Sequence, residues 1–414
     1  MNTNKFIKKL LKLQHLKVVS FLFSDRNRQL HLKVKPDKNG CRCPECQRRC
    51  RILYQPGVER CWQDVRVCGV DVYLHYRPKE IECPTHGRHQ EEIPWADAFS
   101  RITYRLEYLV VRYAQMMTQK DAAGLLGMAT MTFADVLHRI IRRLRDGHRI
   151  RDLKSIGVDE IAYHKGMKYA TLVYDLDRGC VVWVGKGKQK ETIEEFFTDH
   201  LSKYQRERIQ WASCDMSETY IDAIKTHCPN AKLVLDRFHI VKGLNTAMDE
   251  VRKEQWRESS KFERRALKGL RWLLFRHSRN RTRKDTRVLN ELRKGNQRIY
   301  RAWVLKDEFE QIWNYVSVGA AKRFLKNWIT AALRSRLEPL KRYARTLRKH
   351  FEHVIAYMVR GLTNAVAEGL NRVIKMTKNR ASGFRTLEGF ADMIYLRVGD
   401  LDIPAQTAPC FRTI

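Results

Sequence analysis

The stretch from Lys154 to Lys242 decides the order of strands and helices, and it reads KSIGVDEIAYHKGMKYATLVYDLDRGCVVWVGKGKQKETIEEFFTDHLSKYQRERIQWASCDMSETYIDAIKTHCPNAKLVLDRFHIVK. Three short apolar runs come first, and the turn residues DLDRG between the second and the third predict a hairpin. A helix, a strand, a helix and a strand are then expected at residues 191–204, 209–214, 217–228 and 232–235, and another helix starts after 236. Strands that alternate with helices predict parallel pairing through crossover connections.

Two aspartates lie at the strands of this stretch. Asp159 interrupts the first apolar run, and Asp215 directly follows the fourth strand. Buried carboxylates near each other repel unless a cation lies between them, and hard divalent ions take carboxylate oxygens as ligands. Two such ions can hold the attacking and leaving oxygens of a phosphoryl transfer. The acids and the strand order together predict an RNase H-like domain. Taken singly, Asp215 could instead be the N-cap of the next helix, and Asp159 an ordinary acid at a strand edge.

Composition limits the partners of the chain. Its 414 residues predict two or three domains, and 43% of them are hydrophobic. Lysine and arginine number 80 against 46 acids, so the formal charge is +34. This surplus predicts a polyanionic partner, namely double-stranded DNA. No apolar run approaches the ~20 residues of a membrane span, and the N-terminus has no signal-peptide pattern. We therefore expect no membrane partner and a cytoplasmic location.

Residues 1–95 predict a β-rich domain that binds zinc. Seven of the eleven cysteines fall between residues 41 and 83, and in an intracellular protein such a cluster favours a metal over disulfides. Two C-x2-[C/H] knuckles predict a tetrahedral Zn²⁺ site at Cys43, Cys46, Cys83 and His86. Strand structure is expected between the knuckles, at residues 65–76. The alternative ligands are Cys41, Cys50, Cys61, Cys68 and His89.

Residues 96–150 predict a helix-turn-helix domain. The run QKDAAGLLGMATMTFADVLHR begins at Gln119 and places Gly127 at the turn. Its second helix, starting near Thr130, would read a DNA major groove. The DNA-contacting candidates on this helix are Thr130, Thr132, His138 and Arg139. A plain helical hairpin is the alternative.

Residues 246–355 predict a basic helical insertion. Between residues 251 and 350, 29 lysines and arginines stand against nine acids, a surplus of 20, which predicts phosphate contacts. Residues 356–402 then supply a helix whose polar face carries Asn364, Glu368, Asn371 and Lys375. If that helix packs on the sheet, it aims Glu368 at the two aspartates, although an exposed glutamate is the alternative. Residues 403–414 are expected to form a loose tail.

These pieces, and their order, resemble the DDE transposases of the ISL-three family of bacterial insertion sequences. The resemblance spans nearly the whole chain. The matching pieces are CPEC at 43–46, the helix-turn-helix, GVDE at 157–160, CDMS at 214–217, LDRFHIVK at 235–242 and NAVAEGLNRVIKMTKNRASGF at 364–384. In the second knuckle His86 stands where cysteine is expected, which leaves the identity of the fourth zinc ligand open.

The resemblance implies an α/β multidomain protein, in which a zinc-binding domain and a helix-turn-helix precede an RNase H-like core interrupted by an all-helical insertion. The core comprises residues 151–245 and 356–402. In this scheme Asp159, Asp215 and Glu368 bind two Mg²⁺ or Mn²⁺ ions, and Asp236 and Asn371 are auxiliary candidates. The implied reaction binds terminal inverted repeats, cleaves the element ends and joins their 3′ ends to target DNA. At least a homodimer would act, without a small-molecule cofactor.

Two other functions remain open at this point. A DNA-binding regulator descended from a transposase would bind specific DNA without cleaving it. A metal-dependent nuclease with the same three acids would nick DNA without joining strands.

Overall fold

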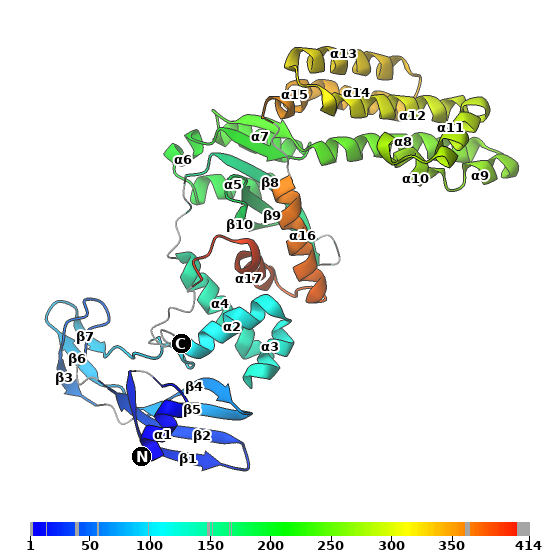
Figure 1. The fold of residues 1–414 in the computed structure, drawn as a ribbon. Helices are drawn as coiled ribbons and strands as arrows, with labels where there is room; N and C mark the ends of the chain where they lie inside the picture. The colour runs from blue at the N-terminus through cyan, green and yellow to red at the C-terminus, as the bar shows by residue number, and fades with distance from the viewer. Residues whose placement is uncertain are drawn as a thin grey trace. The chain divides into compact units, whose positions relative to one another are not determined.

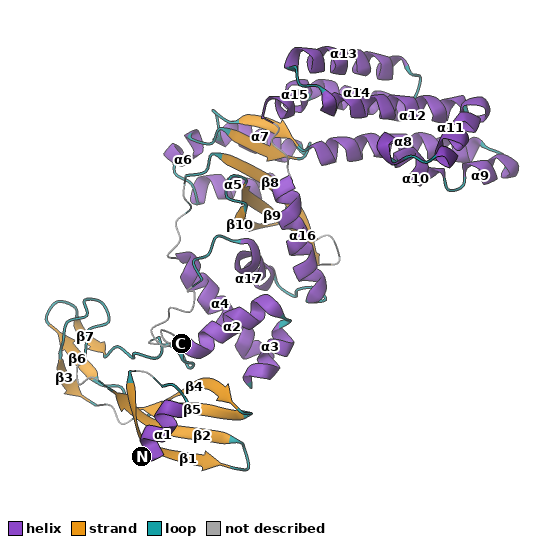
Figure 2. Ribbon diagram, viewed as in Figure 1, coloured by secondary structure: helices purple, strands orange, loops and turns teal. Residues whose placement is uncertain are grey.

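The computed structural model describes residues 3–13, 15–37, 41–55, 58–97, 99–146, 150, 152–164, 166, 168–360 and 365–403. Its internal contacts divide the chain into two compact units, residues 1–149 with 376–414 and residues 150–375 (Figure 1). The fold is mixed α/β. It has a β-rich N-terminal part and a largely helical C-terminal part, as Figure 2 shows.

The first unit opens with two small sheets. A four-stranded sheet has the order β1-β2-β5-β4, and a three-stranded sheet has the order β3-β6-β7. Helix α1 packs on β1, and the core beneath the larger sheet includes Leu32, Trp62 and Leu74. The elements are α1 (Thr3–Leu10), β1 (Leu16–Ser24), β2 (Gln29–Pro36), β3 (Arg51–Tyr54), β4 (Arg60–Val67), β5 (Val70–Tyr76), β6 (Glu80–Cys83) and β7 (Gly87–Gln90).

The expected strand at residues 65–76 proves to be the second half of a hairpin. Strand β4 ends at Val67, β5 begins at Val70, and the two pair antiparallel. Cys68 and Gly69 between them both have positive φ, 51° and 78°, as the first and second positions of a tight two-residue turn require. The alternating pattern continues across this turn, so the sequence alone did not mark the break.

The helical part of the first unit contains the predicted helix-turn-helix. Its elements are α2 (Tyr104–Met116), α3 (Gln119–Leu126), α4 (Thr130–Asp146) and α17 (Leu387–Val398). Helix α3 ends at Gly127, whose φ of 68° is left-handed, and α4 starts at Thr130 as expected. A Cβ on Gly127 would lie 2.5 Å from Oδ1 of Asp71, so glycine is required there for space as well as for backbone conformation.

The C-terminal helix of the described chain belongs to the first unit. Helix α17 packs on α4 and α2, and the compact unit that contains these helices includes residues 376–414. The expected core segment 356–402 stays a prediction. The expected tail lies almost wholly outside the described residues, as does Asn364.

The second unit is built on a five-stranded sheet with the order β10-β9-β8-β11-β12. Strands β10, β9 and β8 pair antiparallel, whereas β8, β11 and β12 are parallel. The helix expected at 191–204 is two helices, because Ser202 forms a capping box with Gln205 and starts a new one. The elements are β8 (Ser155–His164), β9 (Lys168–Asp175), β10 (Cys180–Lys186), α5 (Lys190–Asp199), α6 (Lys203–Glu207), β11 (Trp211–Cys214), α7 (Glu218–His227) and β12 (Lys232–Leu235).

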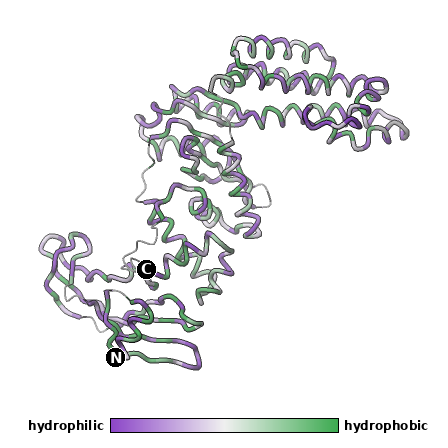
Figure 3. The backbone as a smooth tube through the Cα atoms, in the orientation of Figure 1, coloured by the Kyte–Doolittle hydropathy of each residue, from purple (hydrophilic) through white to green (hydrophobic). Residues whose placement is uncertain are grey.

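A run of helices follows β12. Helix α8 packs against α12, α14 and α10, and α15 packs on β12. Hydrophilic and hydrophobic residues alternate along these helices in Figure 3, as expected for one buried and one solvated face. The elements are α8 (Arg237–Glu258), α9 (Lys261–Leu267), α10 (Leu270–Phe275), η1 (Ser278–Asn280), α11 (Arg283–Gly295), α12 (Gln297–Phe309), η2 (Glu310–Asn314), α13 (Val318–Arg334), α14 (Glu338–Lys349), α15 (Phe351–Arg360) and α16 (Ala365–Arg380).

Among the helices that the structure describes, none has the length and apolar character of a membrane span.

One buried charge pair stabilises the helical insertion. The Lys306 side chain is fully buried and forms an ion pair with Glu310, whose side chain is 8% exposed. We expect Lys306→Ala to leave the buried Glu310 carboxylate with only His277, at 3.4 Å, in place of its lysine partner, and to lower the free energy of unfolding by about 3–5 kcal/mol. Urea unfolding followed by circular dichroism measures this. The exposed pair Lys322–Glu352 supplies the control, because Lys322→Ala should change stability by less than about 1 kcal/mol. Equal effects of the two substitutions would contradict the prediction.

Candidate functional site

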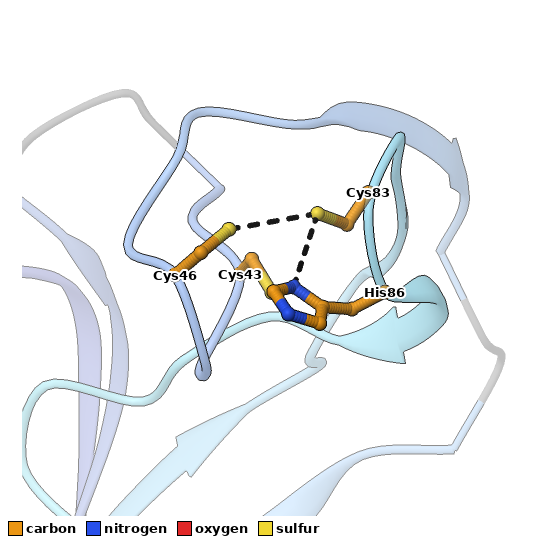
Figure 4. Close-up of side chains that lie close together, drawn as sticks. All are labelled: Cys43, Cys46, Cys83 and His86. Atoms are coloured by element: carbon orange, nitrogen blue, oxygen red, sulfur yellow. Dashed lines mark hydrogen bonds between the residues drawn. The ribbon is translucent and has the colours of Figure 1, made fainter.

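The predicted zinc ligands meet in the first unit (Figure 4). Cys43 and Cys46 come from a turn in which the Gln47 backbone N–H donates to the Cys43 carbonyl. Cys83 is the last residue of β6, and His86 lies in the tight connection to β7. The four ligand atoms all lie within 4.8 Å of one another. The short hairpin and the turn therefore bring together residues that are 40 positions apart in the chain.

The spacing of these atoms suits a tetrahedral ion. The Sγ atoms of Cys46 and Cys83 are 3.6 Å apart, and His86 Nδ1 is 3.6 Å from Cys43 Sγ and 3.7 Å from Cys83 Sγ. Zn–S and Zn–N bonds of normal length imply S···S and S···N edges of about 3.8 and 3.6 Å. The other nitrogen of His86, Nε2, lies 3.6 Å from a Glu45 oxygen, which is the kind of carboxylate contact that orients metal-bound histidines.

Thiol acidity distinguishes one ligand, Cys83, from the nearby Cys41. Hydrogen bonds from the backbone N–H groups of Thr85 and His86 lower the pKa of Cys83 to about 6, so this residue is a thiolate at neutral pH and ready to bind a cation. Burial and a hydrogen bond to Glu91 raise the pKa of Cys41 to about 11, which keeps Cys41 a thiol. The cluster can therefore hold a metal ion through three cysteines and one histidine.

The aspartates of the second unit follow one edge of its sheet. In the parallel pair β11·β8, Ser213 stands opposite Gly157. Counting two residues further along each strand direction places Asp215 next to Asp159. In the pair β11·β12, Cys214 stands opposite Leu235, so Asp236 comes next to Asp215 by the same count. Neighbouring strands lie about 4.8 Å apart. Asp215 and Asp236 therefore follow the carboxyl ends of β11 and β12, and Asp159 lies within the longer neighbouring strand β8.

Electrostatics agree with this register. Burial raises the pKa of Asp159, and the charge of Asp215 adds to the effect, whereas the Glu160 backbone N–H, the charge on His239 and a hydrogen bond from Asn371 lower it. Burial also raises the pKa of Glu160, with contributions from the charges of Asp215 and Asp159. This part of the sheet edge is thus short of positive charge.

The last helix of the second unit docks on Asp159 through Asn371. Its Nδ2 donates a 2.6 Å hydrogen bond to Asp159 Oδ2, and its Oδ1 accepts a 2.7 Å bond from the Tyr174 hydroxyl. Glu368 precedes Asn371 by three residues on the same helix face, and its side chain is exposed. Within the described residues, only the Cys/His cluster has all its ligand atoms within 4.8 Å. The three acids are not gathered that closely, and their joint metal binding stays a prediction.

Asp236 is the N-cap of α8, whereas the N-cap of α7 is Ser217, so the alternative interpretation of Asp215 as an N-cap is wrong. Asp215 Oδ1 accepts from the Ser217 backbone N–H, and Asp236 Oδ1 accepts from that of Phe238, both at 2.9 Å. His239, whose Nε2 lies 3.8 Å from Asp236 Oδ2, was not among the predicted residues. Its spacing of three residues from Asp236 at the start of α8 was the available signal.

The proposed DNA-reading residues divide into two groups. Thr130 and Thr132 lie exposed in the first turn of α4. His138 Nδ1 instead lies 2.8 Å from an Asp392 oxygen of α17, and Arg139 pairs at 3.2 Å with the buried Glu107 of α2. These two side chains join helices of the first unit, and their contact with DNA stays a prediction.

The raised pKa of Asp159 has a consequence for stability. Because the pKa of Asp159 is higher in the folded protein than in the unfolded one, the folded protein holds this proton more tightly. The free energy of unfolding therefore falls progressively as the pH rises above about 4 and the carboxyl loses its proton. In metal-free buffer, we expect Asp159→Asn to melt at a higher temperature than wild type at pH 7, with the difference shrinking towards pH 4. Differential scanning calorimetry between pH 4 and pH 7 measures this difference in melting temperature. Asp222→Asn, an exposed change on α7, is the matched control, and a pH-independent difference would contradict the explanation.

Comparison with known proteins agrees with this assembly of parts. A family model described as a transposase, of the ISL3 type, matches residues 156–394. The transposase for insertion sequence element IS1001 of Bordetella parapertussis is 31% identical over 375 residues, covering 88% of this chain and 91% of that protein. The transposases for element IS1557 of two Mycobacterium tuberculosis strains are each 27% identical to this chain over 369 residues, which cover 83% of this chain and 83% of each of those proteins. DNA is the partner that such a family implies. The family match covers more than half of the chain, and the chain therefore belongs to the ISL3 family of DDE transposases.

Proposed function

We propose that this transposase has an RNase H-like catalytic core, cleaves DNA at the terminal inverted repeats of its insertion sequence and joins the 3′ ends to target DNA. The observation that carries the proposal is the hydrogen bond from Asn371, on the helix that also carries Glu368, to Asp159. The β11·β8 register supports it, because its extension by two residues brings Asp215 next to Asp159. The strand order, three antiparallel strands followed by two parallel ones, supports the RNase H-like assignment.

Asp159, Asp215 and Glu368 are the residues that would hold two Mg²⁺ or Mn²⁺ ions. The donor set fits, because it consists of carboxylate oxygens, the ligands that hard divalent cations prefer. Such ions supply activation of a water and neutralisation of the charge that develops on the phosphate. Asn371 keeps one oxygen of Asp159 oriented, while the Glu160 backbone N–H holds the other at 2.8 Å. Asp236 is the auxiliary carboxylate of the same edge.

Neither step of the proposed reaction requires a nucleotide cofactor, because each step forms one P–O bond and breaks another. Water attacks the phosphodiester at the element end, the P–O3′ bond breaks, and a free 3′-hydroxyl remains on the element. That hydroxyl then attacks a phosphodiester of the target, one P–O bond forming as another breaks. Positioning and charge stabilisation carry both steps. Two element ends must be held together for joining, so we propose at least a dimer on DNA. The same reaction on chromosomal DNA would place the protein at the bacterial nucleoid.

The first unit would recognise the terminal repeat. Zn²⁺ at Cys43, Cys46, Cys83 and His86 would fix the connection that precedes β3 to the β6–β7 hairpin, because three thiolates and one imidazole are ligands that zinc binds tetrahedrally. The exposed start of α4, with Thr130 and Thr132, supplies the candidate base contacts. The basic insertion of the second unit supplies phosphate contacts, which add affinity but little sequence information.

Cleavage of the element's own ends tests the catalytic assignment. Asp159→Asn, Asp215→Asn and Glu368→Gln should each abolish Mg²⁺-dependent cleavage and strand transfer of terminal-repeat duplexes, while binding to those duplexes persists. Asp222→Asn, on the exposed face of α7, is the control and should retain both activities. Wild-type binding without any cleavage would favour the regulator, and nicked products without joined ones would favour the nuclease. Full cleavage by all three variants would reject the triad.

Binding titrations at several salt concentrations test the division of DNA contacts. Thr132→Ala should weaken binding to the terminal repeat about 5-fold, the equivalent of one lost hydrogen bond, and leave a scrambled duplex unaffected. Arg279→Ala, Arg283→Ala and Lys284→Ala, at exposed insertion positions, should weaken both duplexes equally. They should flatten the slope of log affinity against log salt by about 0.9 per lost phosphate contact.

Arg281 of the same insertion is unsuitable for this test, because it pairs with Asp307 and lies over the Trp303 ring. An insertion variant that lost only repeat-specific binding, with an unchanged salt slope, would reverse these roles.

A further inference from the structure

A second group of metal-binding side chains lies on the four-stranded sheet of the first unit. His31 is on β2, His75 on the adjacent β5, and Cys61 on β4 beyond it. Cys61 stands directly opposite His75 in the antiparallel pair, and His31 is opposite Tyr73 in the parallel pair. Residues two apart on a strand share a face. His31, His75 and Cys61 therefore project from one face, opposite the face that buries Leu32 and Leu74.

Two ligand atoms approach one nitrogen of His75. His31 Nδ1 is 2.9 Å from His75 Nε2, and Cys61 Sγ is 3.7 Å from the same nitrogen. Around a tetrahedral zinc ion, two histidine nitrogens would be about 3.4 Å apart, and a nitrogen and a sulfur about 3.6 Å apart. These two separations differ from those of a bound ion by about half an ångström or less. The third pair, Cys61 Sγ and His31 Nδ1, is wider than the 4.8 Å that encloses the four-residue cluster, so binding requires one of these two side chains to rotate towards the other.

The remaining ring nitrogens face oxygen acceptors. His75 Nδ1 lies 3.7 Å from a Glu59 carboxylate oxygen, and His31 Nε2 lies 3.4 Å from the Gln29 amide oxygen. Contacts of this kind fix the ring orientation of metal-bound histidines and increase their basicity. The His31 ring also stacks on Tyr73, with centroids 5.2 Å apart. Each ring is therefore held with one nitrogen towards an acceptor and the other towards the shared centre.

The charge state of the group suits a cation. The Glu59 carboxylate lies 3.7 Å from His75 Nδ1 and is the acid beside the group. Together with a Cys61 thiolate it would balance the two charges of a divalent ion.

We propose that Cys61, His75 and His31 form a second Zn²⁺ site, separate from the four-residue cluster, with the fourth position left to solvent on the outer sheet face. Two imidazoles and a thiolate are borderline to soft ligands, which favour zinc over Mg²⁺ or Ca²⁺. The ion would cross-link β2, β5 and β4, three neighbouring strands of one sheet. That sheet also supports the helix-turn-helix, because Gln63 of β4 donates to the Leu126 and Gly127 carbonyls. The proposal does not depend on the catalytic assignment.

Zinc counting on the full-length protein tests the site. After equilibration with micromolar Zn²⁺ and removal of unbound ion, we expect two equivalents per chain in the wild type. Cys61→Ser and His75→Gln should each retain one equivalent, and Cys83→Ser should lose the other. Glu59→Gln should weaken the second ion about 10-fold or more, measured by competition with a coloured chelator. Cys68→Ser is the matched control, since Cys68 is an exposed cysteine in the β4–β5 turn, and it should retain both ions.

The outcomes separate the two sites. Circular dichroism identifies any variant that fails to fold, and the wild-type count and the Glu59→Gln titration do not depend on the ligand substitutions. A single zinc in both the wild type and Cys61→Ser would overturn the second site and leave the cluster intact. Two zinc ions retained by Cys61→Ser and His75→Gln would overturn it as well.

Discussion

The hydrogen bond from Asn371 to Asp159 joins a helix and a strand that lie 212 residues apart in the chain. The helices α8 to α15 lie between them in the chain. The Tyr174 hydroxyl occupies the amide oxygen of Asn371, which leaves the amide nitrogen to face the carboxylate. Glu368, one helical turn earlier, is carried towards the sheet edge by the same docking. This one contact connects the two separated parts of the proposed core.

The sheet edge is electrostatically unfavourable without a cation. Burial and mutual repulsion raise the pKa values of Asp159 and Glu160, so the metal-free protein bears the cost of holding these acids together. Helix-start hydrogen bonds to Asp215 and Asp236 offset part of that cost. Functional sites commonly break a local stability rule in this way. The arrangement explains why acids stand where apolar residues would pack better.

The positive charge of the chain serves two different purposes. Some arginines neutralise buried acids: Arg105 binds the buried Asp64, and Arg139 and Arg143 both bind the buried Glu107. The planar guanidinium suits such pairs, because it can donate two parallel hydrogen bonds to a carboxylate. Other cations, among them Arg279, Arg283 and Lys284, are exposed and available for phosphates. Net charge therefore indicates a nucleic-acid partner without indicating which residues contact it.

The sequence by itself determined the local elements and the kind of chemistry. Period-two and helical patterns predicted β8 to β12 and their helices, turn residues predicted the β9–β10 hairpin, and knuckle spacing predicted the Cys/His cluster, because each of these depends on residues close in the chain. The tertiary structure decided what depends on distant residues. It paired His138 and Arg139 with Asp392 and Glu107, grouped α17 with the helix-turn-helix, and placed His31, Cys61 and His75 on three neighbouring strands. Such pairings follow from strand register and helix packing, and these are selected by the burial of whole faces, which no short stretch of sequence contains.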